Sequence, residues 1–172
     1  DTAALIRFRE EWAKQGRSVE MMTKPEMNII HELTHVFQCG IRIGLSPAWL
    51  AEGHATYVED DLAKVWDYRN RAGEKIPDAD GAISDGDAYG RGWLFFKYIE
   101  ETCGAAKVRE FGDVWIAQKK SHRKAAEQVT GKKWGDLKKE ELEWSSRFLK
   151  ASVISSGKAS SPSWRYWAMA VS

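Results

Sequence analysis

The sequence has no excess of charge of either sign and no long apolar run. Lys and Arg total 26 and Asp and Glu total 25, so the net charge is +1. This balance gives no support for binding to nucleic acid or to an anionic membrane surface. No apolar run approaches the roughly 18 residues that a membrane-spanning helix needs. We therefore expect neither a nucleic-acid partner nor a membrane span.

Cysteine is also scarce. Cys39 and Cys103 are the only cysteines among 172 residues, and each comes just before a glycine where a helix is expected to end. The pair could form a disulfide in an exported protein or remain as two buried thiols, and the sequence supports both states equally. Asp1 and Thr2 do not begin a signal peptide, but Asp1 is not an initiating methionine, which is compatible with a leader removed earlier. We expect an extracellular or cell-envelope location.

Apolar residues recur at the spacing of an α-helix along most of the chain. We expect helices over residues 2–15, 24–39, 47–66, about 88–103, 105–120, 121–130 and 135–150. A short extended piece is expected over 18–22. The sequence predicts a mainly α fold, with at most a small strand region and one domain over residues 1–150. Residues 151–172 are expected to form a Ser-rich linker and an apolar tail.

The most informative motif is the stretch His31-Glu32-Leu33-Thr34-His35. Residues four apart on a helix lie on one face a turn apart, so both imidazoles can bind one metal ion. Glu32 lies about 100° round the helix from His31, where it can contact a metal-bound water without binding the metal. The motif predicts Zn²⁺ bound by both histidines, with Glu32 as the general base that takes the proton of the water. The alternative is a pair of core histidines on a buried helix face.

A second expected helix supplies two carboxylates. Glu52 lies 52 − 35 = 17 positions after His35, which allows a short turn and an antiparallel return beside the first helix. We predict Glu52 as the third zinc ligand, and we expect Gly53 to let the two helices approach closely at that point. Glu59 is predicted to accept a hydrogen bond from the distal nitrogen of a ligating histidine. Glu59 could instead pair with a surface lysine or arginine.

Residues Pro25 to about Gly104 resemble the gluzincin metallopeptidases, the thermolysin-like group whose third zinc ligand is the glutamate of a Glu-Gly pair. The motifs that carry the resemblance are HELTH and the downstream WLAEGHATYVE. The EGHATYVE stretch is most similar to the aminopeptidase branch. HELTHVFQ is also similar to the plant basic secretory proteins of the same clan, so the subfamily stays open. The resemblance implies hydrolysis of a peptide or protein substrate.

A third motif, Tyr89-Gly90-Arg91-Gly92, resembles the Tyr-x-Lys-Gly motif of the aminopeptidase branch. The resemblance implies that Tyr89 donates a hydrogen bond to the oxyanion formed during hydrolysis. Arg91 stands where the family has lysine, which keeps the charge but changes its geometry. Tyr89 could also be an ordinary tyrosine at the start of an amphipathic helix.

The aminopeptidases also carry a Gly-x-Met-Glu-Asn segment, whose glutamate holds the free amino group of the substrate. Only 30 residues precede His31, and none of them matches this segment. The resemblance therefore favours an endopeptidase, or a catalytic domain that works with further domains of a longer protein. Two alternatives stay open: an aminopeptidase-like exopeptidase with an amine-binding group outside this chain, and a zinc-stabilised binding module without turnover. A purely structural site would need neither Glu32 nor Tyr89.

Other titratable residues are given structural interpretations. His54 is two positions from Glu52 and is expected to point to the other side of its helix, as a structural or cleft-lining residue. His122 lies in a basic run and is expected to be solvated. An acidic, Gly-rich stretch lacks the spacing of an EF-hand and is expected to be a plain loop, with Asp78, Asp80, Asp85 and Asp87.

Overall fold

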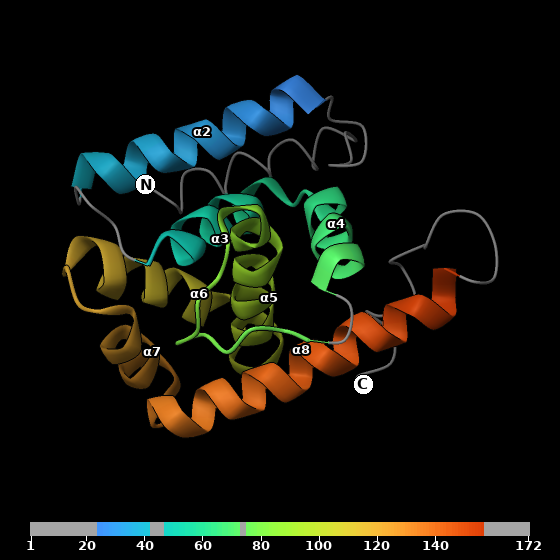
Figure 1. Cartoon of the computed structure of the whole chain (residues 1–172). Helices are drawn as coiled ribbons and strands as arrows, with labels where there is room; N and C mark the ends of the chain where they lie inside the picture. Colours follow the sequence, from blue (N-terminus) through green and yellow to red (C-terminus); the bar gives the residue numbers. More distant parts are fainter. Residues whose placement is uncertain (1–23, 42–46, 73–74, 157–172) are drawn as a thin grey trace.

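The computed structural model describes residues 24–41, 47–72 and 75–156, and 81% of this part is helical, with no strand. The predicted mainly α fold is thus confirmed. The helix expected over 2–15, the extended piece over 18–22 and residues 157–172 lie outside the described part. The described helices are α2 (Lys24–Ile41), α3 (Ala48–Glu59), α4 (Leu62–Ala72), α5 (Asp85–Cys103), α6 (Ala105–Gly112), the π-helical η2 (Asp113–Ala117), α7 (His122–Thr130) and α8 (Trp134–Ser156) (Figure 1). None of them combines the length and apolarity needed to cross a bilayer.

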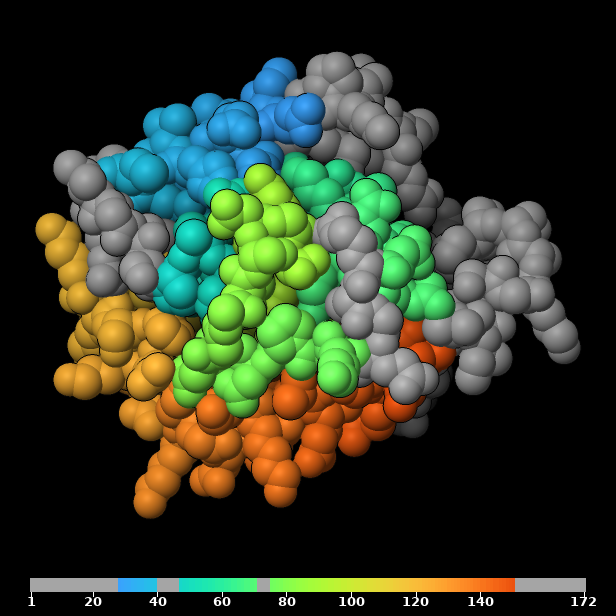
Figure 2. Space-filling view, in the orientation of Figure 1, coloured from blue at the N-terminus to red at the C-terminus, as the bar shows by residue number. Residues whose placement is uncertain are grey.

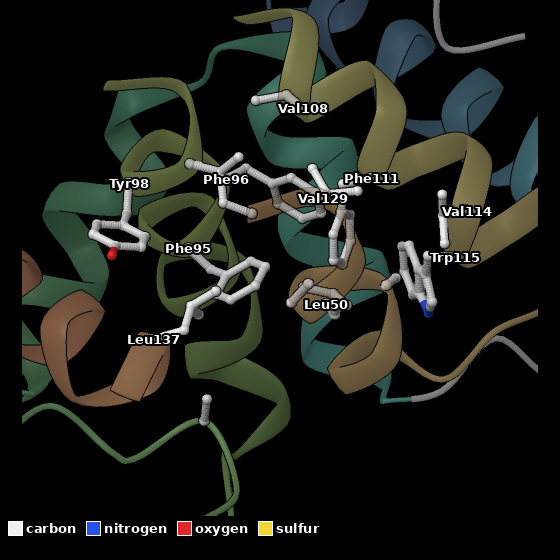
Figure 3. Packing of buried hydrophobic residues seen from close by; sticks show 14 of the residues in the cluster. Leu50, Phe95, Phe96, Tyr98, Val108, Phe111, Val114, Trp115, Val129 and Leu137 are labelled. Carbon is white, nitrogen blue, oxygen red and sulfur yellow. The ribbon is translucent and has the colours of Figure 1, made fainter. Parts of the chain in front are cut away.

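Helix α5 stands at the centre of the molecule and packs against α3, α4, α6 and α8 (Figure 1). Its middle carries four consecutive apolar residues, Trp93 to Phe96, all of them buried, so this helix is covered on every side rather than along one stripe. Phe95 and Phe96 meet Phe111 and Trp115 in the largest apolar cluster (Figure 3). Full burial of each such side chain contributes about 1.5–3 kcal/mol, which makes this cluster the main anchor of the fold.

Helix α2 is an outer element that packs mainly on α3. In the space-filling view, α2 forms the upper edge of the visible face and α8 the lower edge, with the start of α5 between them (Figure 2). The buried face of α2 carries His31, Thr34 and Gln38. Its opposite face leaves four apolar side chains exposed, those of Ile29, Leu33, Val36 and Phe37.

Helices α3 and α5 touch backbone to backbone at two glycines. A Cβ atom added to Gly53 would lie 2.1 Å from the Cα of Gly92, and one added to Gly92 would lie 2.2 Å from the carbonyl oxygen of Trp49. The expectation that Gly53 brings α3 close to the histidine helix is therefore wrong. Gly53 lies about 100° round α3 from Glu52, so when Glu52 faces α2 the glycine faces α5.

The helix expected over 47–66 is divided in two. Helix α3 ends at Glu59, and Asp60 adopts a left-handed conformation with φ 62°. The N–H of Asp60 donates to the carbonyl of Thr56 at 2.9 Å, which caps the end of α3. The side chain of Asp61 then accepts a hydrogen bond from the N–H of Ala63 at 2.9 Å, at the start of α4. The chain thus turns between the two helices instead of continuing.

Other boundaries also differ from the prediction. Helix α5 begins at Asp85 rather than near residue 88. At its start the hydroxyl of Ser84 donates to the carboxylate of Asp87 at 2.8 Å. The segment expected as one helix over 105–120 is α6 followed by the π-helical η2. Helix α8 continues to Ser156, past the expected end of the domain at residue 150.

A fully buried ion pair ties α5 to α8. The Arg91 guanidinium donates two hydrogen bonds to the Glu141 carboxylate, at 2.9 and 2.6 Å, and both side chains have no exposed surface. Arg91 also donates to the carbonyl oxygen of Pro77 at 2.9 Å and lies 5.4 Å from the ring centroid of Trp49. Arg91 is therefore a buried structural residue, and its planar guanidinium makes a bidentate contact with Glu141 that a lysine could not make.

The acidic loop before α5 is held to α7 and α8. Asp80 accepts a hydrogen bond from the indole of Trp134 at 3.1 Å and pairs with Lys138 at 3.0 Å and Arg123 at 2.9 Å. The expectation that His122 is solvated is wrong, because its ring packs edge-on against Trp134 at 5.2 Å and its Nε2 is buried. Burial lowers the pKa of His122.

Candidate metal centre

His31 and His35 of α2 and Glu52 of α3 bring three donor atoms together. The two Nε2 atoms lie 3.1 Å apart, and each lies 3.2 Å from Oε2 of Glu52. Zinc bonds of 2.0–2.2 Å in a tetrahedron would place ligand atoms about 3.3–3.6 Å apart, so the observed triangle would need to widen by only a few tenths of an ångström to hold zinc. Within the described part of the chain, these residues form the group of His, Cys, Asp and Glu side chains that could hold a metal ion.

The charges of this cluster favour a cation at its centre. Burial opposes protonation of His31, but hydrogen bonds to Glu52 and Glu59 outweigh it and raise its pKa to about 9. Hydrogen bonds from His31 and His35 lower the pKa of Glu52 to about 2. A carboxylate and two ring nitrogens this close repel one another unless a proton or a metal ion lies between them. The arrangement is thus suited to hold positive charge.

Glu59 lies behind His31, on the side away from the cluster. The Nδ1 atom of His31 donates to Oε1 of Glu59 at 3.0 Å, and the Glu59 carboxylate is fully buried. This is the contact that the sequence predicted, and it leaves Nε2 as the ring nitrogen of His31 that faces Glu52. The alternative partner expected for Glu59 is present as well, because the ammonium of Lys64 donates to the same oxygen at 2.5 Å.

Lys64 is a member of the site that sequence reasoning missed. Its ammonium lies 3.4 Å from Nδ1 of His31 and 5.3 Å from the ring centroid of Tyr89, in addition to its bond with Glu59. A buried carboxylate is costly without a compensating cation, and Lys64 supplies it. The sequence did not predict this contact because Lys64 follows Glu59 by five positions, and residues five apart on a continuous helix do not share a face. The turn at Asp60 makes the contact.

Gln38 is the second missed member. Its side-chain oxygen lies 2.8 Å from Nδ1 of His35, and its amide nitrogen contacts α3 at the carbonyl of Ala51 and at His54. His54 is fully buried, as expected of a structural residue, and burial lowers its pKa to about 4. Although His54 points to the other side of α3 from Glu52, it is connected to the site, because it contacts Gln38, which in turn contacts His35.

Glu32 and Tyr89, the two predicted catalytic residues, both lie next to His31, Glu32 in sequence and Tyr89 through its ring. Glu32 follows His31 on α2 and its side chain is exposed. The ring of Tyr89, at the start of α5, is half-buried with its centroid 5.7 Å from that of His31. Burial raises the pKa of Tyr89, and the negative charges of Glu52, Glu32 and Glu59 add to the effect. The hydroxyl therefore stays protonated and can act as a hydrogen-bond donor.

The remaining candidates do not join the cluster. Cys39 and Cys103 are free thiols, exposed and half-buried respectively. Asp78 and Asp80 are engaged by Lys138, in keeping with a structural loop rather than a calcium site. Comparison with models of protein families, with curated proteins and with solved structures finds no match to this chain.

Proposed function

We propose that the protein is a zinc-dependent peptidase of the gluzincin type, with the metal ion held by His31, His35 and Glu52. The observation that carries this proposal is the triangle of three donors, 3.1–3.2 Å on each side, supplied by two helices. Both imidazoles have their Nδ1 atoms engaged by other side chains, so their Nε2 atoms, which face Glu52 and each other, are the atoms that would bind the metal. Two imidazoles and one carboxylate suit catalytic zinc, which keeps a fourth position for water.

A zinc ion bound there would activate a water molecule and polarise the carbonyl of the substrate. Glu32 accepts the proton of the attacking water and then passes it to the leaving amine, as its exposed position beside His31 allows. Tyr89 donates a hydrogen bond to the carbonyl oxygen while negative charge develops on it, which stabilises the transition state more than the ground state. Glu59 holds His31 in the orientation that directs Nε2 to the metal.

The substrate we propose is an internal bond of a peptide or protein. No segment of the sequence matches the amine-binding motif of the aminopeptidases, and none of the cluster residues is left to hold a substrate amino group. The main rival is a binding module stabilised by zinc. Such a module would have no use for a glutamate next to a ligating histidine or for a protonated tyrosine whose ring lies beside it.

Metal analysis joined to cleavage of a mixed peptide library tests the proposal. Glu32→Gln should keep the zinc content of the wild type and lose peptidase activity by several orders of magnitude, because it removes the base and no ligand. His35→Ala should lose both properties. Glu143→Gln makes the same chemical change at an exposed site on α8 and should alter neither.

Each contrary outcome removes a different part of the proposal. A wild-type protein that binds no zinc contradicts the metal centre, and one that binds zinc but cleaves nothing is a binding module. Full activity in Glu32→Gln excludes that residue as the base. Strong loss of cleavage on N-acetylation of a good peptide, with single residues released from its amino end, would make the enzyme an aminopeptidase.

A further inference from the structure

Gln38 connects the metal centre to the interior of α3. It is 2% exposed, and its side-chain amide makes three contacts. Oε1 lies 2.8 Å from Nδ1 of His35, while Nε2 lies 3.1 Å from the carbonyl oxygen of Ala51 and 2.9 Å from Nδ1 of His54. One buried side chain therefore touches a candidate ligand, a backbone acceptor and a second imidazole.

The carbonyl of Ala51 determines which way the amide of Gln38 faces. A carbonyl oxygen only accepts hydrogen bonds, so the Gln38 atom 3.1 Å away must be the NH₂ group. The amide oxygen then faces His35, and because this oxygen also only accepts, Nδ1 of His35 must carry the proton. In a neutral His35 ring, Nε2 is then the atom with the lone pair, and it lies 3.1 Å from Nε2 of His31, which can donate to it, and 3.2 Å from Oε2 of Glu52. The reverse orientation would set two oxygens against each other inside the protein.

His54 reinforces this orientation. The NH₂ group of Gln38 can only donate, so Nδ1 of His54 accepts, and its proton is on Nε2. That Nε2 atom is buried beside the rings of Phe96 and Trp115, and none of the described residues forms a hydrogen bond with it. An unpaired buried N–H costs free energy, and an apolar side chain would fill this place without that cost. What His54 adds in return is an acceptor for Gln38.

We propose that Gln38, fixed by Ala51 and His54, is a positioning residue that holds His35 in the tautomer with a free Nε2. A neutral imidazole bound through Nε2 must carry its proton on Nδ1, and the wrong tautomer would have to rearrange before it could bind a metal. The consequence for metal binding rests on the proposed zinc centre. The tautomer itself does not, because it follows from hydrogen bonds of the metal-free protein.

Nitrogen-15 NMR of the metal-free protein measures the tautomer directly. The spectrum is recorded at a pH alkaline enough for the ¹⁵N shifts to show His35 as neutral. Wild-type His35 should carry its proton on Nδ1. Gln38→Met removes the acceptor at similar size and should shift His35 toward the Nε2–H form. Gln128→Met makes the same change on α7, at an exposed residue outside the cluster, and should leave His35 unaltered.

Zinc affinity, measured by competition with a chelator, is the second readout. Gln38→Met should weaken binding about 10–100-fold, as loss of a residue that orients a ligand does. The tautomer of the wild-type protein tests the inference by itself if Gln38→Met folds poorly. A neutral wild-type His35 protonated on Nε2, or a folded Gln38→Met protein with the wild-type tautomer, overturns the inference. A wild-type protein with the expected tautomer but no zinc affinity contradicts the proposed function and leaves the role of Gln38 intact.

Discussion

Replacing Gly92 by alanine would push a methyl group into the backbone of α3. The new Cβ atom would lie 2.2 Å from the carbonyl oxygen of Trp49 and 2.4 Å from the Cα of Gly53, whereas ordinary contact begins at 3.4 Å. The two helices would have to separate by 3.4 − 2.2 = 1.2 Å. Overpacking of this kind costs up to about 3 kcal/mol. We expect the melting temperature to fall by about 6–12 °C, at 2–4 °C per kcal/mol for a chain of this size.

The same separation would affect the site. Glu52 precedes Gly53 on α3 and Tyr89 lies one turn before Gly92 on α5, so a shift of the two helices moves the ligand relative to the hydroxyl. A displacement of about 1 Å near a catalytic group can lower the rate about 10²-fold. Because the proposed zinc ligands all come from α2 and α3, zinc content should change little.

Thermal and urea unfolding followed by circular dichroism provide the melting temperature and the free energy of unfolding, with Gly86→Ala as the matched control. Gly86 lies in the first turn of the same helix, and nothing lies within 4 Å of an added Cβ atom there. This control should be as stable as the wild type or more stable by up to about 1 kcal/mol, because alanine has less freedom than glycine in the unfolded chain. If Gly92→Ala proves as stable as Gly86→Ala, the backbone contact between α3 and α5 is wrong.

Three further outcomes are expected. Arg91→Met should lower the free energy of unfolding by about 3–5 kcal/mol, because it leaves the Glu141 carboxylate buried without its cation; a loss below about 1 kcal/mol in urea unfolding would argue against a dehydrated pair. Glu59→Gln should weaken zinc binding about 10–100-fold in a chelator competition, and unchanged affinity would show that Glu59 does not support the proposed zinc site. In the metal-free protein, the stabilisation from the raised pKa of His31 should be complete below pH 6.5 and lost as the pH rises through about 9. In His31→Asn, the free energy of unfolding should depend less on pH across that interval. An unchanged pH dependence would contradict the assignment to His31.

The sequence predicted the parts of the site that depend on regular helix geometry. His31 and His35 meet because residues four apart share a face, and Glu59 reaches the far side of His31 because seven positions bring it back to the azimuth of Glu52. These relations need only the existence of two helices and their antiparallel approach. For the same reason the mainly α class and most helix positions were predictable.

The sequence did not predict the features that depend on how the helices are joined and packed. The left-handed turn at Asp60 has no glycine to signal it, so the chain was expected to continue as one helix and Lys64 was missed. The partner of Gly53 and the burial of His122 depend on helices that are remote in the sequence. The contacts of Gln38 depend on the packing of α2 against α3, which helical periodicity alone does not specify.

The buried pair of Arg91 and Glu141 has a consequence for shortened versions of the chain. The two residues are 50 positions apart, and α8 contributes none of the donors of the metal cluster. A truncation before α8 would nevertheless leave the Arg91 guanidinium, which lies beside Trp49, without its carboxylate partner. Arg91 is on α5, the helix that also carries Tyr89. The hydroxyl of Ser145 donates to the same carboxylate at 2.7 Å and completes the pair. The smallest fragment that keeps the site folded must therefore extend through Ser145, more than 50 residues beyond the last residue of the site.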